Sequence, residues 1–201
     1  MGVIHNTREG EMIRTGDTIH NPVTGERITF LATSADTDGE VVVIETVVQP
    51  HGSVAAAHVH PFQSERFAVV HGALGMKVRG NKLTLLPDET FIVEPGTPHR
   101  FWNAGENEVS FVCEVRPALQ FESLLETMFA LAEDGKTNRK GMPNPLRLAV
   151  IARAHFDTVR LPHPPAWLQK VGLAIGAPLG RALGYTPAYA PDVSAPAIPA
   201  V

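Results

Sequence analysis

The stretch that decides the fold lies at residues 52–72, with the sequence GSVAAAHVHPFQSERFAVVHG, and is followed by EPGTPHRFWN at residues 94–103. Side chains along a β-strand alternate between its two faces. If residues 58–60, His-Val-His, are extended, both imidazoles therefore point to the same side. Glu65 would begin the next strand, and His99 would come from a later one. The sequence predicts that three imidazoles and one carboxylate converge inside a sheet.

Short runs of β-branched or alternating residues continue on both sides of this stretch. Glycine or proline interrupts them at short intervals, which is typical of a sandwich or barrel of many short strands. We expect strands near residues 28–32, 40–49, 57–60, 65–71, 73–79, 82–86, 89–94, 99–103 and 108–116.

The periodicity changes at Pro117, after which apolar residues recur at helical spacing. A first helix is expected over residues 121–132, ended by Gly135. A second is expected after Asn144, as an N-cap residue followed by a proline at the first helical position. The chain is thus expected to divide into parts, namely an N-terminal arm (1–16), a β-barrel (17–117), a helical extension (118–186) and a Pro/Ala-rich tail (187–201).

A third helix is expected over about residues 166–185, and glycines recur in it at every fourth position. Each glycine costs an isolated helix about 1 kcal/mol relative to alanine, so packing must hold this helix in place. Four arrangements are open: a cap on the outer face of the barrel, a lid over the barrel mouth, a clasp between two subunits, and shallow attachment to a membrane.

Composition limits the class of protein. The 201 residues carry a formal net charge of −4, and no basic block indicates a nucleic-acid surface. The single cysteine, Cys113, excludes an internal disulfide and fits a reducing compartment. No apolar run of about 18 residues exists, so no transmembrane segment is expected. We expect a soluble cytoplasmic protein, assembled as a homodimer, that takes a small-molecule substrate or ligand.

The first histidine motif resembles that of the cupin family. That motif is a glycine, five residues, His-x-His, three or four residues, Glu, six residues and Gly. Every element is present here, as Gly52, His58, His60, Glu65 and Gly72.

The second cupin motif is matched in part. Gly96, His99 and Asn103 occupy their expected positions. Asp88 stands where the motif begins with glycine, and Glu94 stands at its proline position. These departures fall on turn residues and not on ligands.

The resemblance covers residues 40–116 and implies a mainly β fold, a double-stranded β-helix or jelly-roll barrel, to which the helices form a C-terminal appendage. It also implies that His58, His60, Glu65 and His99 are metal ligands. Three neutral imidazoles and a carboxylate suit one divalent first-row metal. Fe, Mn, Ni, Co and Zn all remain open, although an octahedral ion with two free positions fits better than a structural zinc.

Alternation extends the prediction to the walls of a pocket. Phe67 and Phe101 lie two residues after ligands and should face the interior with them. Met76 lies on another apolar strand face. Gln63, in the loop before Glu65, would either meet a metal-bound ligand or remain an exposed loop amide.

Single-domain cupins that resemble quercetin dioxygenases imply a metal-dependent oxidoreductase acting on a small oxygenated organic molecule. Glu65 would then be the general base, if it can leave the metal. Two other hypotheses stay open. The chain could be a non-catalytic ligand-binding module with a structural or vestigial metal, or a sugar-phosphate isomerase. The isomerase would need basic residues near the metal, whereas Arg66 and Arg100 point outward if the ligands point in.

Overall fold

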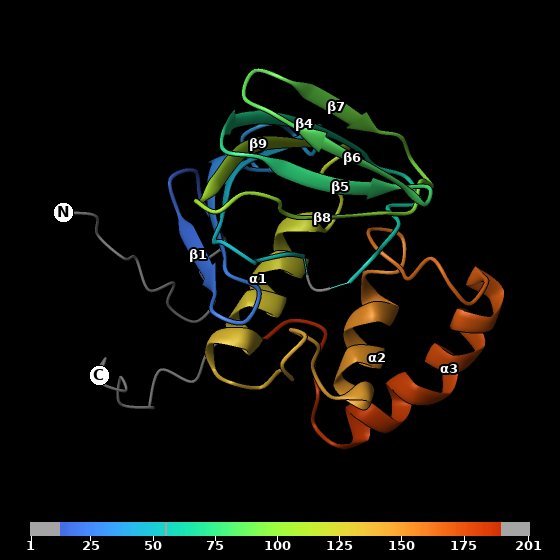
Figure 1. Ribbon diagram of the computed structural model, residues 1–201. Coiled ribbons are helices and arrows are strands. Elements are labelled where there is room, and N and C mark those ends of the chain that lie inside the picture. The colour runs from blue at the N-terminus through green and yellow to red at the C-terminus, as the bar shows by residue number, and fades with distance from the viewer. Residues whose placement is uncertain (1–12, 55, 190–201) are drawn as a thin grey trace.

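A computed structural model describes residues 13–54 and 56–189 of the chain (Figure 1). Two antiparallel sheets form a barrel, and helices lie along one side of it. The larger sheet has the order β1 (Thr18–Asn21), β2 (Glu26–Ala32), β3 (Val42–Val48), β9 (Val109–Arg116), β4 (Ser64–His71) and β7 (Thr90–Val93). The smaller sheet has the order β6 (Asn81–Leu85), β5 (Leu74–Val78) and β8 (His99–Asn103). The expected mainly β fold with C-terminal helices is confirmed.

The core follows from the alternation along the strands of the larger sheet. The register aligns Phe67 on β4 with Cys113 on β9, and aligns Cys113 in turn with Ile44 on β3 and Phe30 on β2. All four side chains are buried. One inward-facing row of apolar side chains therefore crosses four strands, and Met76 on the opposite sheet belongs to the same core.

The expected strand at residues 57–60 is not a regular strand of either sheet. His58 instead bridges His99, with backbone N···O distances of 2.9 and 3.0 Å in the two directions. Val59 bridges Arg160 in the helical extension in the same reciprocal manner. The segment therefore makes one bridge to β8 on one side and one bridge to the helical extension on the other. Its backbone is paired on both sides without a longer ladder to either neighbour.

The extension contains α1 (Phe121–Glu133), α2 (Pro145–Ala154) and α3 (Ala166–Ala182). Asn144 caps α2 as expected, since its side chain accepts a hydrogen bond from the backbone N–H of Arg147 at 3.0 Å. Of the expected arm and tail, residues 1–12 and 190–201 lie outside the described residues.

Two of the glycines in α3 allow close packing against α2, beside which α3 runs (Figure 1). A Cβ on Gly180 would lie 2.5 Å from the carbonyl oxygen of Leu146, and one on Gly176 would lie 3.0 Å from the Cβ of Ala149. A Cβ on Gly172 would meet no atom within 4 Å. The helix is therefore held by α2, and not by the outer face of the barrel.

We predict opposite effects for two substitutions in α3. Gly180→Ala should destabilise the protein by about 1–3 kcal/mol, because the new methyl group collides with backbone that cannot rotate away. Gly172→Ala should be neutral or stabilising by up to about 1 kcal/mol, since it gains helix propensity in open space. Chemical unfolding of both variants measures the difference, and equal effects would contradict this packing.

Candidate metal centre

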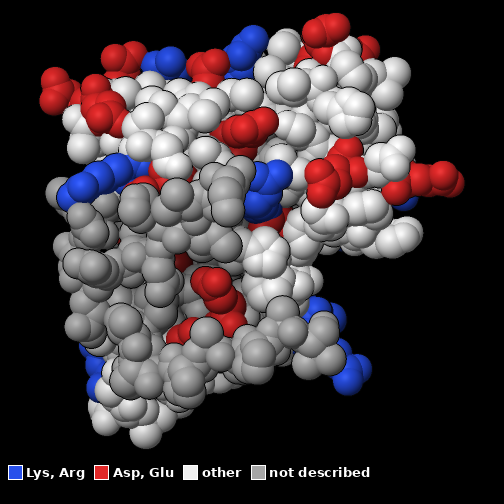
Figure 2. Space-filling view, turned by 90° about the vertical axis from the view of Figure 1, so that its left-hand side faces the viewer, with Lys and Arg blue, Asp and Glu red and all other residues white. Residues whose placement is uncertain are grey.

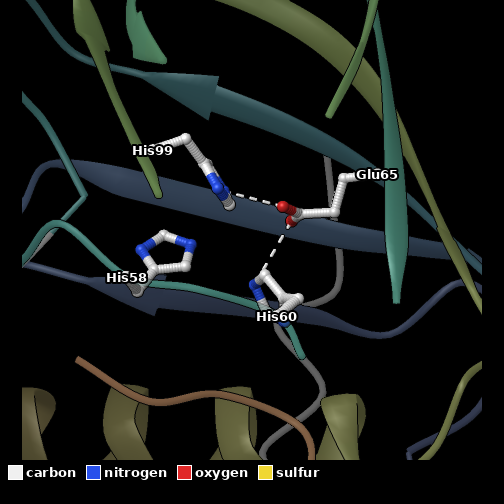
Figure 3. Close-up of side chains that lie close together, drawn as sticks. All are labelled: His58, His60, Glu65 and His99. Carbon is white, nitrogen blue, oxygen red and sulfur yellow. Dashed lines mark ion pairs between the residues drawn. The ribbon is translucent and has the colours of Figure 1, made fainter. Parts of the chain in front are cut away.

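The four predicted ligands come together at the end of the barrel that faces the helices (Figure 3). His58 and His60 lie on the bridging segment, Glu65 lies on β4 and His99 begins β8. One donor atom from each residue lies within 4.8 Å of the donor atoms of the other three. This grouping fits a metal site.

The hydrogen bonds around the cluster orient all three imidazoles. The Nδ1 atom of His58 lies 2.9 Å from the carbonyl oxygen of Ala56, and that of His99 lies 3.0 Å from the carbonyl oxygen of Thr97. The Nδ1 atom of His60 lies 2.7 Å from the carbonyl oxygen of Thr158. A carbonyl oxygen only accepts, so each Nδ1 must donate. Each neutral ring then presents the lone pair of Nε2, which is the form that ligates a metal.

Two buried polar atoms of the cluster lack a hydrogen-bond partner among the described residues. The Oε2 atom of Glu65 and the Nε2 atom of His99 are 2.7 Å apart, but no hydrogen bond of good geometry reaches either of them from the described residues. Both are lone-pair acceptors when Nδ1 of His99 carries the proton. Two buried acceptors that face each other at this distance need a proton or a cation between them. The donor set therefore fits a divalent ion.

The electrostatics of the cluster keep Glu65 ionised and His58 neutral. Burial alone raises the pKa of Glu65, but the imidazoles of His60 and His99 outweigh it and lower the pKa to about 2. Burial of the His58 ring, aided by His99 and His60, lowers its pKa to about 3. Burial is the largest single effect on His99 and opposes its protonation, but the hydrogen bond and charge of Glu65 and the carbonyl oxygen of Thr97 together outweigh it and raise the pKa of that ring.

Gln63 supports the cluster from behind. Its Oε1 atom lies 3.0 Å from Nδ1 of His60, and its Nε2 donates to the carbonyl oxygens of Pro117 and Ala118 at 2.8 and 3.0 Å. The side chain is buried and is not among the residues that line the cavity. Neither expectation for Gln63, a pocket wall or an exposed loop amide, matches this position. It links the ring of His60 to the junction between the barrel and α1.

A cavity of about 640 Å³ opens beside the cluster. His58, His60 and Glu65 line it together with Phe67 and Phe101. Met76, which was expected in the wall, is completely buried in the core and is not among the lining residues. Side chains of the larger sheet pack against the face of β5 that carries Met76, so the cavity does not extend to that residue.

The helical extension forms much of the cavity wall, which the strand pattern did not predict. Most of the lining residues from the extension are apolar, with Arg160 and Gln169 as polar exceptions. The apolar ones include Phe121, Leu125, Met128, Phe129, Leu148, Ile151, Phe156 and Leu168. The apolar stripes of these helices were visible in the sequence, but not the surface against which they would face. Of the arrangements considered from the sequence, the helices therefore match the lid: they form the wall of the cavity at the mouth of the barrel.

Glu26 is a polar cavity residue that was missed in the sequence. It is buried on β2 and shares the inward face with Ile28 and Phe30. The register places it three inward-facing rows from Glu65 along the sheet. Burial raises its pKa to about 7, against a smaller lowering effect of the Thr24 hydroxyl. Its alternation with two apolar residues was the signal that could have identified it.

Comparison with known proteins agrees with this geometry. The family described as Cupin domain matches residues 38–114, the part of the chain that holds all four ligands. Residues 38–114 form a cupin domain. Outside the matched cupin domain lie β1, β2, the last two residues of β9 and all three helices.

Two curated proteins resemble the cupin domain. One is quercetin 2,3-dioxygenase of Bacillus subtilis (strain 168), 27% identical over 93 residues, which are 46% of this chain and 25% of that protein. The other is the tetracenomycin polyketide synthase protein TcmJ of Streptomyces glaucescens, 30% identical over 66 residues, which are 33% of this chain and 44% of that protein. The chain thus spans less than half the length of either relative.

Among solved structures, a predicted oxalate decarboxylase from Thermotoga maritima is 14% identical, with a TM-score of 0.46 over 53% of this chain and 99% of that one. KdgF from Halomonas sp. is 18% identical, with a TM-score of 0.44 over 54% and 94%. In the described part of the chain, no helix combines the length and apolar character needed to cross a membrane.

We predict that His99→Ala and His58→Ala lower the bound metal by at least about tenfold, because each removes one of four donors. His71→Ala is the matched control, since His71 is exposed at the end of β4 and lies outside the cluster. Elemental analysis of the purified variants gives the metal content, and circular dichroism checks that they are folded. Equal metal loss in all three would mean that histidine removal acts through general destabilisation.

Glu26 should make the stability depend on pH. Its folded pKa of about 7 lies above the ordinary value of 4.5, so the folded protein binds more protons than the unfolded chain between these values. The free energy of unfolding should therefore fall as the pH rises through this range. Relative to the parent, Glu26→Gln should gain up to about 3 kcal/mol at pH 8 and little at pH 4.5.

Urea unfolding at both pH values tests this prediction. Glu94→Gln is the control, because it removes the same charge from an exposed position. A gain that is independent of pH, or one shared by the control, would contradict the raised pKa of Glu26.

Proposed function

We propose that the protein is a metal-dependent oxidoreductase of the cupin dioxygenase type that acts on a small, largely apolar, oxygenated organic molecule. One observation carries this proposal: three of the four ligands line a cavity of about 640 Å³. A structural metal site is normally closed by its ligands, whereas a catalytic site keeps access for substrate. The volume suits a molecule of drug or metabolite size.

His58, His60, Glu65 and His99 would hold one divalent ion. Bound there, iron, manganese, nickel or cobalt would supply Lewis acidity and redox chemistry with O₂. The chain's own contribution is to orient the donors. The carbonyl oxygens behind the rings keep the imidazoles in one tautomer, so no reorganisation is needed when the site is filled.

Glu65 is the proposed catalytic base. Its low pKa keeps it a carboxylate at neutral pH. Oε2 faces Nε2 of His99 at 2.7 Å and would be the oxygen that holds the ion, whereas Oε1 lies 3.6 Å from Nε2 of His60. Oε1 is therefore the freer atom, and it would accept a proton from an acidic hydroxyl of the substrate.

The remaining walls would determine the shape of the substrate. Phe67 and Phe101, with ring centroids 6.0 Å apart, offer edges and faces to an aromatic or aliphatic body. The apolar helical residues would exclude water from the reacting end. Glu26, which is largely protonated below pH 7, would donate a hydrogen bond to an oxygen at the distant end of the substrate. Similarity to quercetin 2,3-dioxygenase supports the reaction class. A cytoplasmic location and a homodimer remain predictions from the sequence.

Oxygen uptake by protein loaded separately with iron, manganese, nickel and cobalt tests this function, with flavonols, diketones and thiols as substrates. We expect uptake with at least one metal and one substrate class. Glu65→Gln should lower the rate by at least about a hundredfold, because the base is lost. Glu94→Gln, at an exposed position, should retain the parent rate.

Metal content measured on the same samples separates the alternatives. Full metal occupancy without uptake for any substrate would contradict the oxidoreductase and favour a non-catalytic module that binds small ligands. Uptake that survives Glu65→Gln at full metal content would remove Glu65 from the role of base while leaving the reaction class in place.

A further inference from the structure

The outer face of α3 is apolar and exposed over its whole length. It consists of Trp167, Leu168, Val171, Ile175, Leu179 and Leu183, which recur at helical spacing and are between 43% and 67% exposed. We call this set the apolar face. The opposite side of the same helix, with Ala177 and Gly180, is buried against α2. No residue of the described part of the chain covers the apolar face, and a contiguous patch of this kind normally marks an interaction surface.

The charge of the chain is divided unequally. Residues 136–191 contain eight lysines and arginines and one acidic residue, a net charge of +7. The rest of the sequence contains nine basic and twenty acidic residues, a net charge of −11. Acidic side chains are spread over the barrel in Figure 2. The helix pair is therefore the basic pole of an otherwise acidic protein.

Two of the basic residues lie on α3 itself. Lys170 and Arg181 are exposed, and the helical spacing places them together at one edge of the apolar face. No acidic residue occurs in the sequence between Thr158 and Pro191. An apolar face edged by cations and free of acidic residues is the pattern of a helix that lies in the interface of a membrane.

The same pattern disfavours a second copy as the occupant. In an antiparallel two-fold pairing through this face, Lys170 and Arg181 of one copy would lie along the same side as those of the other, and α3 carries no acidic residue to pair with them. The helix also does not span a bilayer, because its 17 residues reach about 26 Å and carry two charges. We propose that the apolar face docks on an anionic membrane surface, with α3 lying flat among the headgroups and the acidic barrel directed away.

This orientation would place the cavity next to the lipid. Leu168, Gly172 and Leu173 of α3 line the cavity, and Leu168 also belongs to the apolar face. An apolar ligand dissolved in the membrane would then reach the cavity without crossing water. The docking itself does not depend on which reaction the metal centre supports.

Co-sedimentation of the full chain with lipid vesicles tests the docking. Vesicles of phosphatidylcholine with about 30 mol% phosphatidylglycerol should bind about thirtyfold more tightly than phosphatidylcholine alone, since each of two cations near the surface contributes about fivefold. Added salt should weaken the binding. Equal binding to both vesicle types, or none to either, would overturn the proposal.

Paired variants assign the binding to α3. Ile175→Ser with Leu179→Ser should lower the affinity at least about tenfold, because both side chains lose apolar area that lipid would bury. Leu86→Ser with Ile92→Ser removes two equally exposed apolar residues from the barrel and should change nothing. In the same way, Lys170→Gln with Arg181→Gln should remove the preference for anionic lipid. Lys77→Gln with Lys82→Gln, at exposed positions on β5 and β6 of the smaller sheet, should not.

Tryptophan emission separates lipid from the other occupants. The chain has two tryptophans, so the difference between the parent and Trp167→Phe isolates Trp167. Its emission should be that of an exposed indole in the free protein and should shift to the blue on anionic vesicles. A blue-shifted emission without lipid, together with dimers that Ile175→Ser and Leu179→Ser dissociate, would assign the face to a second copy. Blue-shifted Trp167 emission without lipid in a protein that remains monomeric would assign the apolar face to residues 187–201 of the same chain.

Discussion

The structure depends on one constraint: the lone pairs of three imidazoles and a carboxylate must all point at one place. An imidazole can do this only if its other nitrogen donates to something fixed. Here the acceptors are carbonyl oxygens of Ala56, Thr97 and Thr158. The first two lie within two residues of the histidine they serve. The third is 98 residues away in sequence and belongs to the helical extension. The orientation of His60 is therefore shared between the barrel and the helices.

This dependence changes the role of the extension. Arg160 bridges Val59, directly between two candidate ligands, so the segment that follows α2 is paired with the backbone that carries His58 and His60. The helices before and after it line the cavity with apolar side chains. A barrel without them would open the cluster to water and leave the ring of His60 with Gln63 as its only described acceptor. The extension is thus a part of the candidate site.

The sequence predicted most barrel strands and the clustering of the four candidate ligands, because both follow from short-range rules. Alternation placed Phe67 beside Glu65, and the His-x-His spacing placed two rings on one side. The same rules failed for Gln63 and Met76. Gln63 lies in a loop, where no period fixes the direction of a side chain, and Met76 lies on a strand whose inward face meets core instead of space. Glu26 was overlooked because a charged residue in a strand is normally taken as the solvent side.

What the sequence determined by itself was the local periodicity, the donor types and their spacing, the helix caps and the uneven division of charge. These are properties of neighbouring residues, so no long-range contact is needed to read them. Only the tertiary structure decided that α3 packs on α2 through Gly180, that Thr158 orients His60, and that the cavity lies between the sheet and the helices. Each of these depends on which apolar surfaces meet across more than thirty residues of chain. Hydrophobic attraction is non-directional, so the sequence pattern does not specify which apolar surfaces will pair.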